Sequence, residues 1–207
     1  MPAPSFDLQA AYNWIEAQCN DANVRYSQSY RNMQTVNGLT YFDCSSLMFF
    51  GLWLGGGFDV ALYGFSTTLT DYTNPSPGHY ANAWVVQTME PILVSAGWQD
   101  VRTDLPSDWL PGDILIKYAG GGYSWHTEMV YSGEPNLMQM GARNSHITPA
   151  TDQVAIHTLY TGYYDRILRD PTQPTPTPGP GPGPHPGPSY RMPIWLIKRA
   201  KEVNGWI

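Results

Sequence analysis

The residues of this chain best suited to chemistry begin with a cysteine. Cys44 follows Asp43 and precedes Ser45, and a strongly apolar run over 47–54 comes next and ends at three glycines. This pattern predicts a buried helix that starts at the cysteine. The helix dipole and the unpaired N–H groups at such a helix end favour the nucleophilic thiolate and can also stabilise an oxyanion. The alternative interpretation is a small apolar cysteine of the core.

A histidine about eighty residues further along the chain could supply the base. Pro-Gly-Asp at 111–113 precedes an apolar segment, 114–118, and the glycine-rich stretch 120–122 leads into a second segment that begins at His126. This pattern predicts two strands joined by a hairpin, with His126 at the start of the second strand. A cysteine nucleophile needs a base within hydrogen-bond reach, and histidine is the usual one. A structural histidine at a strand end is the alternative.

The base would need a polar side chain to fix its ring. A third apolar segment, 136–140, can lie antiparallel beside the second strand. From there Gln139 is predicted to accept from the second ring nitrogen of His126. Asn144 and His146, on the connection that follows, are the alternatives for this role.

The two blocks resemble the motifs of the NlpC-type papain-like cysteine peptidoglycan hydrolases. Asp-Cys-Ser-Ser at 43–46 is similar to the nucleophile motif of that family, and the Pro-Gly-Asp and strand-initial His-Thr are similar to its second block. The stretch 26–31 ahead of Tyr-Phe-Asp-Cys looks like the bacteriophage endolysin branch. The resemblance covers roughly residues 5–165.

The resemblance implies a hydrolase that cuts an amide bond in the peptide part of bacterial peptidoglycan through a cysteine thioester. The enzyme would be an endopeptidase or an N-acetylmuramoyl-L-alanine amidase, and it would need no cofactor. Cys44 would be the nucleophile, His126 the base and then the acid, and Gln139 the orienting residue. The chain departs from the commoner family pattern in having Ser46 in place of glycine and glutamine in place of histidine at the third position.

Further residues are candidates for contact with the substrate or the oxyanion. Tyr26 matches the position of a family tyrosine that lines the substrate groove. Asp43 and Ser45 flank the nucleophile, and Trp125 lies beside the proposed base. The segment 55–78, rich in Gly, Thr, Asn and Pro, is expected to form a loop that shapes the groove.

Other chemistries find less support in the sequence. A zinc amidase remains an alternative, but His79, His126, His146 and His157 form no close pair with metal-type spacing, so we expect no metal site. The chain has no Gly-x-Ser-x-Gly elbow for a serine nucleophile. A non-catalytic wall-binding module on the same fold is the main alternative from another class.

The order of the predicted elements gives the fold class. Helices are expected over 7–19, 44–54 and 79–97, the last interrupted or shifted at Pro91, and strands follow between 99 and 168. Helices followed by strands predict an α+β, papain-like fold with N-terminal helices packed on a central antiparallel sheet. Cys19 shares the apolar face of the first helix, so we expect it to be buried and unpaired.

Composition divides the chain into three parts. Residues 1–170 form the expected catalytic domain, 171–189 a Pro/Gly-rich polyproline II linker, and 190–207 a short helical element that could begin a wall-binding module. Sixteen acids and seven bases precede the tail, which carries four bases and one acid, so the tail could contact anionic wall polymers whereas the domain does not resemble a nucleic-acid binder. We expect a monomer.

The sequence also bears on where the protein acts. No segment approaches the apolar length that spans a membrane, and the first residues lack the basic and apolar regions of a secretory signal. With the family resemblance, these features predict synthesis in the cytoplasm of a host bacterium and action on its wall after release.

Overall fold

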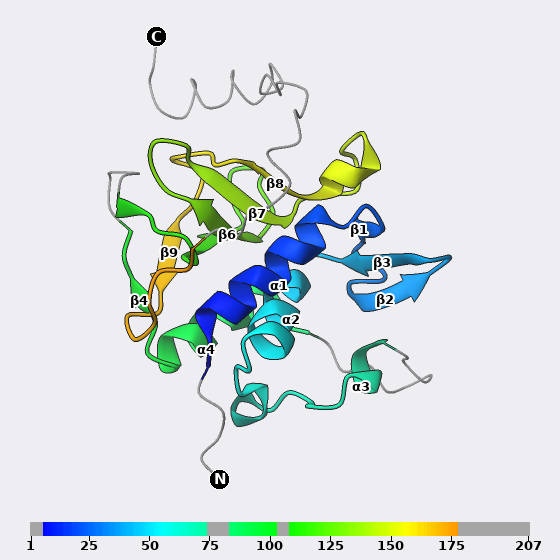
Figure 1. The fold of residues 1–207 in the computed structure, drawn as a ribbon, viewed down its shortest axis with the longest axis horizontal. Helices are drawn as coiled ribbons and strands as arrows, with labels where there is room; N and C mark the ends of the chain where they lie inside the picture. The colour runs from blue at the N-terminus through cyan, green and yellow to red at the C-terminus, as the bar shows by residue number, and fades with distance from the viewer. Residues whose placement is uncertain (1–5, 74–82, 103–107, 178–207) are drawn as a thin grey trace.

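The computed structural model describes residues 6–73, 83–102 and 108–177, which form an α+β fold with a helix-rich N-terminal part and two sheets (Figure 1). In chain order the elements are α1 (Leu8–Asn20), β1 (Val24–Tyr26), β2 (Asn32–Val36), β3 (Leu39–Phe42), α2 (Cys44–Phe50), a π-helical turn (Gly51–Gly55), a 3-10 turn (Val60–Tyr63), α3 (Thr70–Thr73), α4 (Val86–Ser95), β4 (Gln99–Asp100), β5 (Ile114–Lys117), β6 (His126–Ser132), β7 (Met138–Ala142), a 3-10 turn (Ala150–Gln153), β8 (Val154–Thr158) and β9 (Arg166–Arg169).

The larger sheet has six antiparallel strands in the order β4-β9-β5-β6-β7-β8. Helix α1 packs against β7 and β8, and α2 packs against β6 and β7, as Figure 1 shows around the centre of the molecule. The predicted strands and the antiparallel neighbour of the His126 strand are therefore confirmed. Helices packed on one face of an antiparallel sheet bury the apolar side of both layers.

Helix α1 follows the predicted apolar stripe. Its N-cap is Asp7, whose carboxylate accepts from the backbone N–H of Ala10 at 2.9 Å. Leu8, Ala11, Tyr12, Ile15 and Cys19 are buried on the side that faces the sheet. Cys19 is a free, buried cysteine, as expected.

Helix α2 is buried on every side. All seven of its residues are buried, since the larger sheet, strands β2 and β3 and the aromatic side chains around Phe49 pack against it. The helix expected over 44–54 continues beyond Phe50 only as the π-helical turn. Glycine at position 51 lets the π-helical turn lie close to α1, because a Cβ there would lie 2.3 Å from the Ile15 side chain.

A small sheet in the N-terminal part was not expected from the sequence. Strands β1 and β2 flank β3, with β1 parallel and β2 antiparallel to it. Most side chains of these short strands are only half-buried, so they lack a clear alternation of apolar and polar residues. This sheet leads directly into Asp43 and so fixes the direction in which the chain enters α2.

Two expectations for the middle of the chain need correction. Helix α4 continues through Pro91, so no interruption occurs there, although proline removes one helical hydrogen bond. Burial of Val86, Met89 and Leu93 offsets that loss. The described part of the segment predicted as a loop contains a 3-10 turn and α3, and its Tyr72 is buried in the core. Residues 74–82 lie outside the described residues.

The start of the proline-rich segment contacts the domain. The side-chain amide of Gln9 accepts from the Thr177 N–H at 2.7 Å and donates to the Thr177 carbonyl at 3.1 Å. Pro176 is buried, close enough to Gly112 that a Cβ at position 112 would lie 2.9 Å from its ring. Pro176 and Thr177, near the start of the expected linker, therefore contact the domain, and the linker beyond residue 177 lies outside the described residues. The expected element at 190–207 lies outside the described residues.

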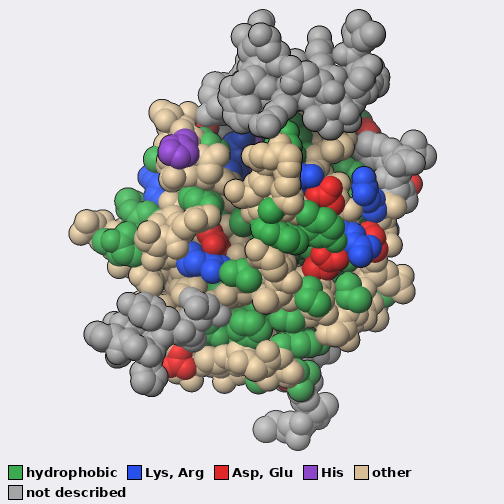
Figure 2. Space-filling view, turned by 180° about the vertical axis from the view of Figure 1, so that it is seen from behind, with side chains coloured by type: hydrophobic (Ala, Val, Ile, Leu, Met, Phe, Trp, Pro, Cys, Tyr) green, Lys and Arg blue, Asp and Glu red, His purple; other side chains and the backbone are tan. Residues whose placement is uncertain are grey.

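Acidic and basic side chains are interspersed on the face shown in Figure 2. Elsewhere in the described residues the charged side chains form ion pairs, such as Lys117 with Asp165 at 2.8 Å and Arg166 with Glu90 at 3.1 Å. Across the part of the chain that the structure describes, no helix is long and apolar enough to cross a membrane.

Candidate active site

Cys44 is the first residue of α2, and local contacts fix this helix end. The carboxylate of Asp43 accepts from the Ser46 N–H at 2.8 Å, and the Ser46 hydroxyl oxygen accepts from the Asp43 N–H at 2.9 Å. This reciprocal pair is a capping box, which satisfies backbone donors that a helix end otherwise leaves unpaired. The position of Cys44 therefore follows from the residues on either side of it.

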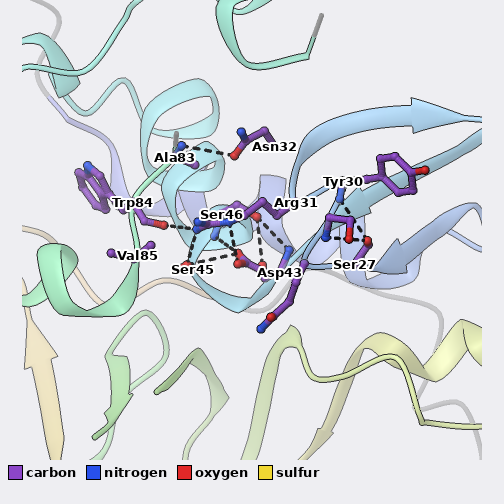
Figure 3. A network of polar contacts seen from close by, with 12 residues as sticks. Ser27, Tyr30, Arg31, Asn32, Asp43, Ser45, Ser46, Ala83, Trp84 and Val85 are labelled. Atoms are coloured by element: carbon purple, nitrogen blue, oxygen red, sulfur yellow. Dashed lines mark hydrogen bonds and ion pairs between the residues drawn. The ribbon is translucent and has the colours of Figure 1, made fainter. Parts of the chain in front are cut away.

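An arginine links this helix end to two other segments (Figure 3). Arg31 Nε lies 2.7 Å from the second carboxylate oxygen of Asp43, and the Arg31 guanidinium donates to the Ser45 hydroxyl at 2.9 Å and to the Trp84 carbonyl. Asp43 and Ser45, both expected near substrate, are buried in this network. These contacts join the start of α2 to the segments that carry Arg31 and Trp84.

The larger sheet brings four polar side chains to one face. His126 and Glu128 are two positions apart on β6, so they share a face. Gln139 on β7 pairs with Val130 of β6 and with His157 of β8, and directly paired residues also point the same way. His126, Glu128, Gln139 and His157 therefore project from the same side of three neighbouring strands.

His126 contacts both the cysteine and a carboxylate. Cys44 is the first of the groups that raise the pKa of the His126 ring, and Nε2 of that ring lies 3.0 Å from Glu128 Oε1, so Nδ1 is the nitrogen left for the sulfur. Burial alone would lower the pKa of His126, but the hydrogen bonds to Cys44 and Glu128 and their charges raise it to about 10. The arrangement therefore favours the imidazolium form of His126.

Glu128 is the central acid of the site. Its side chain is only 1% exposed, and its second oxygen, Oε2, lies 2.9 Å from Nε2 of His157. Burial would raise the pKa of Glu128, yet the charge of His157 and the hydrogen bonds to His126 and His157 hold it well below its usual range. Gly141 leaves room for this side chain, since a Cβ there would lie 2.6 Å from Glu128 Cγ.

The structure separates Gln139 from the role expected of it. The Gln139 amide accepts from the Tyr164 hydroxyl at 3.0 Å, and its nitrogen lies 3.4 Å from His157 Nε2. The hydrogen-bond partner of the second ring nitrogen of His126 is Glu128, not Gln139. Sequence spacing placed Gln139 on the correct neighbouring strand and face, but Gln139 stands opposite Val130, four positions along β6 from His126.

The two alternatives for the orienting residue lie elsewhere. Asn144 and His146 are exposed, and the Asn144 side chain accepts from the backbone N–H of His146 at 2.8 Å in the turn after β7. Sequence reasoning missed Glu128, although a His-x-Glu pattern on a strand puts both side chains on one face. It also missed His157 as a contact of Glu128, because that contact depends on the pairing of β7 with β8.

Two tyrosines lie near the thiol from different parts of the chain. Burial, followed by the charge of Cys44, raises the pKa of Tyr26 to about 12. The Tyr163 ring packs edge-on to His126 with centroids 6.3 Å apart, and its pKa is raised by burial and by the charges of Glu128 and Cys44. Both tyrosines are therefore close enough to Cys44 for its charge to act on them, and the contact of Tyr26 with substrate stays a prediction.

Trp125 is partly buried and packs against Tyr118, with ring centroids 5.1 Å apart. It therefore belongs to the packing beside His126. Among the described residues, no group of three or more His, Cys, Asp or Glu side chains is arranged to hold a metal ion.

Comparisons with models of known protein families, with curated proteins and with solved structures gave no match for this chain.

Proposed function

We propose that the chain is a papain-like cysteine hydrolase that cuts an amide bond in the peptide part of bacterial peptidoglycan. The observation that carries the proposal is that Cys44 and Glu128 both act on the His126 ring: Cys44 raises its pKa, and Glu128 Oε1 lies 3.0 Å from its Nε2. A nucleophile, a base and an acid that orients the base are the recurring requirements of acyl transfer through a covalent intermediate.

In the first half-reaction the Cys44 thiolate attacks the carbonyl carbon of the substrate amide. A C–S bond forms, and the carbonyl π electrons move to oxygen, where the backbone N–H of Cys44 helps to hold the negative charge. The His126 imidazolium then donates its Nδ1 proton to the leaving nitrogen, the C–N bond breaks, and a thioester remains. Glu128 keeps the ring in place while its charge changes.

In the second half-reaction neutral His126 takes a proton from water as the water oxygen attacks the thioester. The tetrahedral intermediate collapses, the C–S bond breaks, and a carboxylic acid product leaves. The thiolate and the imidazolium are then restored. No metal or cofactor takes part in this scheme.

The choice of substrate comes from the sequence resemblance to the bacteriophage endolysin branch. Tyr26 and Tyr163, which lie near the thiol, are suited to line the substrate groove. In this role the protein would be made in the cytoplasm of a host bacterium, act on the wall after release and cause lysis. An endopeptidase and an N-acetylmuramoyl-L-alanine amidase use the same chemistry at different amides.

Replacing the nucleophile tests the proposal. Cys44→Ala is expected to reduce the release of soluble peptide from purified cell walls by roughly a thousandfold or more. Cys19→Ala is the matched control, since Cys19 is a buried free cysteine on α1 that takes no part in the scheme. It should keep the activity at a modest cost in stability.

Two further measurements identify the bond and the class of protein. Mass spectrometry of the released fragments separates an amidase, which frees the N-terminus of L-alanine, from an endopeptidase, which frees an amine within the stem or cross-bridge. Wall hydrolysis that survives Cys44→Ala but is lost with a metal chelator would instead point to a zinc amidase. Wall binding without any hydrolysis by the unaltered chain would identify a binding module.

A further inference from the structure

A second imidazole, His157, contacts the acid of the proposed site from the side opposite His126. His157 Nε2 lies 2.9 Å from Glu128 Oε2, whereas His126 uses Oε1 of the same carboxylate. The other ring nitrogen of His157, Nδ1, lies 3.1 Å from the backbone carbonyl of Thr158. Each ring nitrogen thus faces an oxygen atom at hydrogen-bond distance.

The two oxygen partners bear on the protonation of the His157 ring. A backbone carbonyl only accepts hydrogen bonds, and so does an ionised carboxylate. A ring that donates to both of these oxygens carries a proton on each nitrogen, which is the imidazolium form. Nε2 has a second neighbour, the Gln139 side-chain nitrogen at 3.4 Å, which lies farther away than the Glu128 oxygen at 2.9 Å.

We propose that His157 is a positioning residue of this site, which holds the Glu128 carboxylate as a permanent counter-charge through the oxygen that His126 does not use. The proposal rests on the function proposed above, because it gives His157 a task within that reaction. His157 does not touch the reacting atoms; it acts through Glu128.

The reaction cycle supplies the reason for a second cation. His126 is an imidazolium only until it protonates the leaving nitrogen, and it is neutral while the thioester exists. A carboxylate that is 1% exposed and has no remaining counter-charge would then be costly. With His157 charged throughout, Glu128 stays ionised and keeps its direction, so that His126 returns to the same geometry for the second half-reaction.

The groups that face His157 agree with this charge. Glu128 on β6 is the anion, and Gln139 on β7 is neutral. The Tyr160 ring, on the connection between β8 and β9, has its centroid 6.3 Å away, and the Tyr164 hydroxyl lies 3.4 Å from the same Glu128 oxygen. Burial and the charge of Glu128 raise the pKa of Tyr164, so its hydroxyl stays protonated and neutral.

Nitrogen NMR of the full chain with isotope-labelled histidine tests the protonation directly. An imidazolium gives two similar ring-nitrogen shifts, whereas a neutral ring gives one protonated and one lone-pair shift that lie far apart. The His157 signals, assigned by their loss in His157→Gln, are expected to be those of an imidazolium at neutral pH. In Glu128→Gln the His157 ring should become neutral. A neutral His157 ring in the unaltered chain overturns the proposal, and it does so whether or not the protein hydrolyses walls.

Kinetics of two His157 variants test the positioning. His157→Gln keeps a donor for Glu128 without the charge, and His157→Leu removes both. We expect kcat to fall about 10-fold for the first and about 100-fold for the second with KM nearly unchanged, since the loss would arise only after substrate has bound. The acidic limb of the pH profile should move to higher pH in both variants, because the pKa of Glu128 rises when the cation is removed.

The exposed histidine on the preceding turn provides the matched control. His146→Gln changes the same side chain away from the cluster and should leave kcat and the pH profile unaltered. If His157→Leu folds, as circular dichroism would report, and retains both the kcat and the acidic limb of the unaltered protein, His157 does not position Glu128. That result would leave the proposed function intact, whereas full activity of Cys44→Ala would remove the proposed function itself.

Discussion

The two halves of the candidate site are held by different kinds of contact. The half that carries Cys44 depends mainly on neighbours in the chain, since Asp43 and Ser46 are three positions apart and Arg31 and Ser45 fourteen. The half that carries His126 depends on strand pairing, and Tyr164 reaches Gln139 and Glu128 across 25 and 36 positions. The proposed nucleophile is thus placed locally, whereas the proposed base is placed by the sheet.

This difference predicts how each half responds to change. Substitutions near Cys44 should act first on the stability of a helix end, because its contacts are capping contacts. Substitutions in the sheet half should act first on turnover, because a buried network orients the ring that moves the proton. The following four predictions test that contrast in order of expected size.

The largest effect is expected from the base itself. His126→Ala should lower kcat/KM by roughly a thousandfold or more, because it removes the proton transfer in both half-reactions. The His126 side chain is 16% exposed at the start of β6, so the fold should be kept. Kinetics of wall hydrolysis with circular dichroism measure both properties, and His146→Ala is the exposed control. Activity within a few-fold of the unaltered protein would exclude His126 as the base.

A smaller effect is expected from the acid that orients the base. Glu128→Gln should lower kcat by roughly 100-fold, since the amide keeps the shape of the carboxylate but loses the charge that favours imidazolium. Gln139→Leu leaves the Tyr164 hydroxyl short of its acceptor and should cost about 1–3 kcal/mol of stability with little change in kcat. If Gln139→Leu instead lowered kcat and Glu128→Gln lowered only the stability, Gln139 would be the orienting residue, as the sequence suggested.

The link between the two halves can be measured by titration. Cys44→Ala should lower the pKa of His126 from about 10, because the contact with Cys44 is the first of the interactions that raise it. Because the folded-state pKa of His126 is raised, protonation of His126 stabilises the folded protein. This stabilisation is fully present below the unfolded pKa of about 6.5, and it is lost as the pH rises through the folded-state pKa. The variant should therefore lose this stabilisation at lower pH than the unaltered protein does.

Proton NMR of the His126 ring and urea unfolding at several pH values check this result. Cys19→Ala is again the control, and its His126 titration should be unaltered. A His126 pKa that is the same in Cys44→Ala as in the unaltered protein would show that the two halves do not communicate through this hydrogen bond.

The smallest effect is expected from the cap of α2. Asp43→Ala should lower the free energy of unfolding by about 1–2 kcal/mol, since it removes a cap and leaves Arg31 without its carboxylate. Asp7→Ala at the N-cap of α1 is the matched control, because among the described residues no ion pair joins Asp7 to an arginine. Urea unfolding of both variants compares them. A loss at Asp43 no larger than that at Asp7 would mean that the Arg31 pair adds nothing.

Much of the fold could be read from local patterns. The stripe of α1, the apolar run of α2 and the strands of the larger sheet are strong periodic signals, and all of them are present. The small sheet of β1 to β3 was missed because short, half-buried strands carry no such signal. Pro91 was expected to interrupt a helix that packing in fact maintains.

The sequence by itself determined the nucleophile half: an acid, a cysteine and two serines before an apolar run specify where a helix begins, because capping acts within one turn. Only the tertiary structure decided the other half. Which of Glu128, Gln139 and His157 reaches His126 depends on strand register and on the space left by Gly141, and residues that lie far apart in the chain settle both. The pairing of strands determines which residue stands opposite which, whereas spacing along the sequence alone does not.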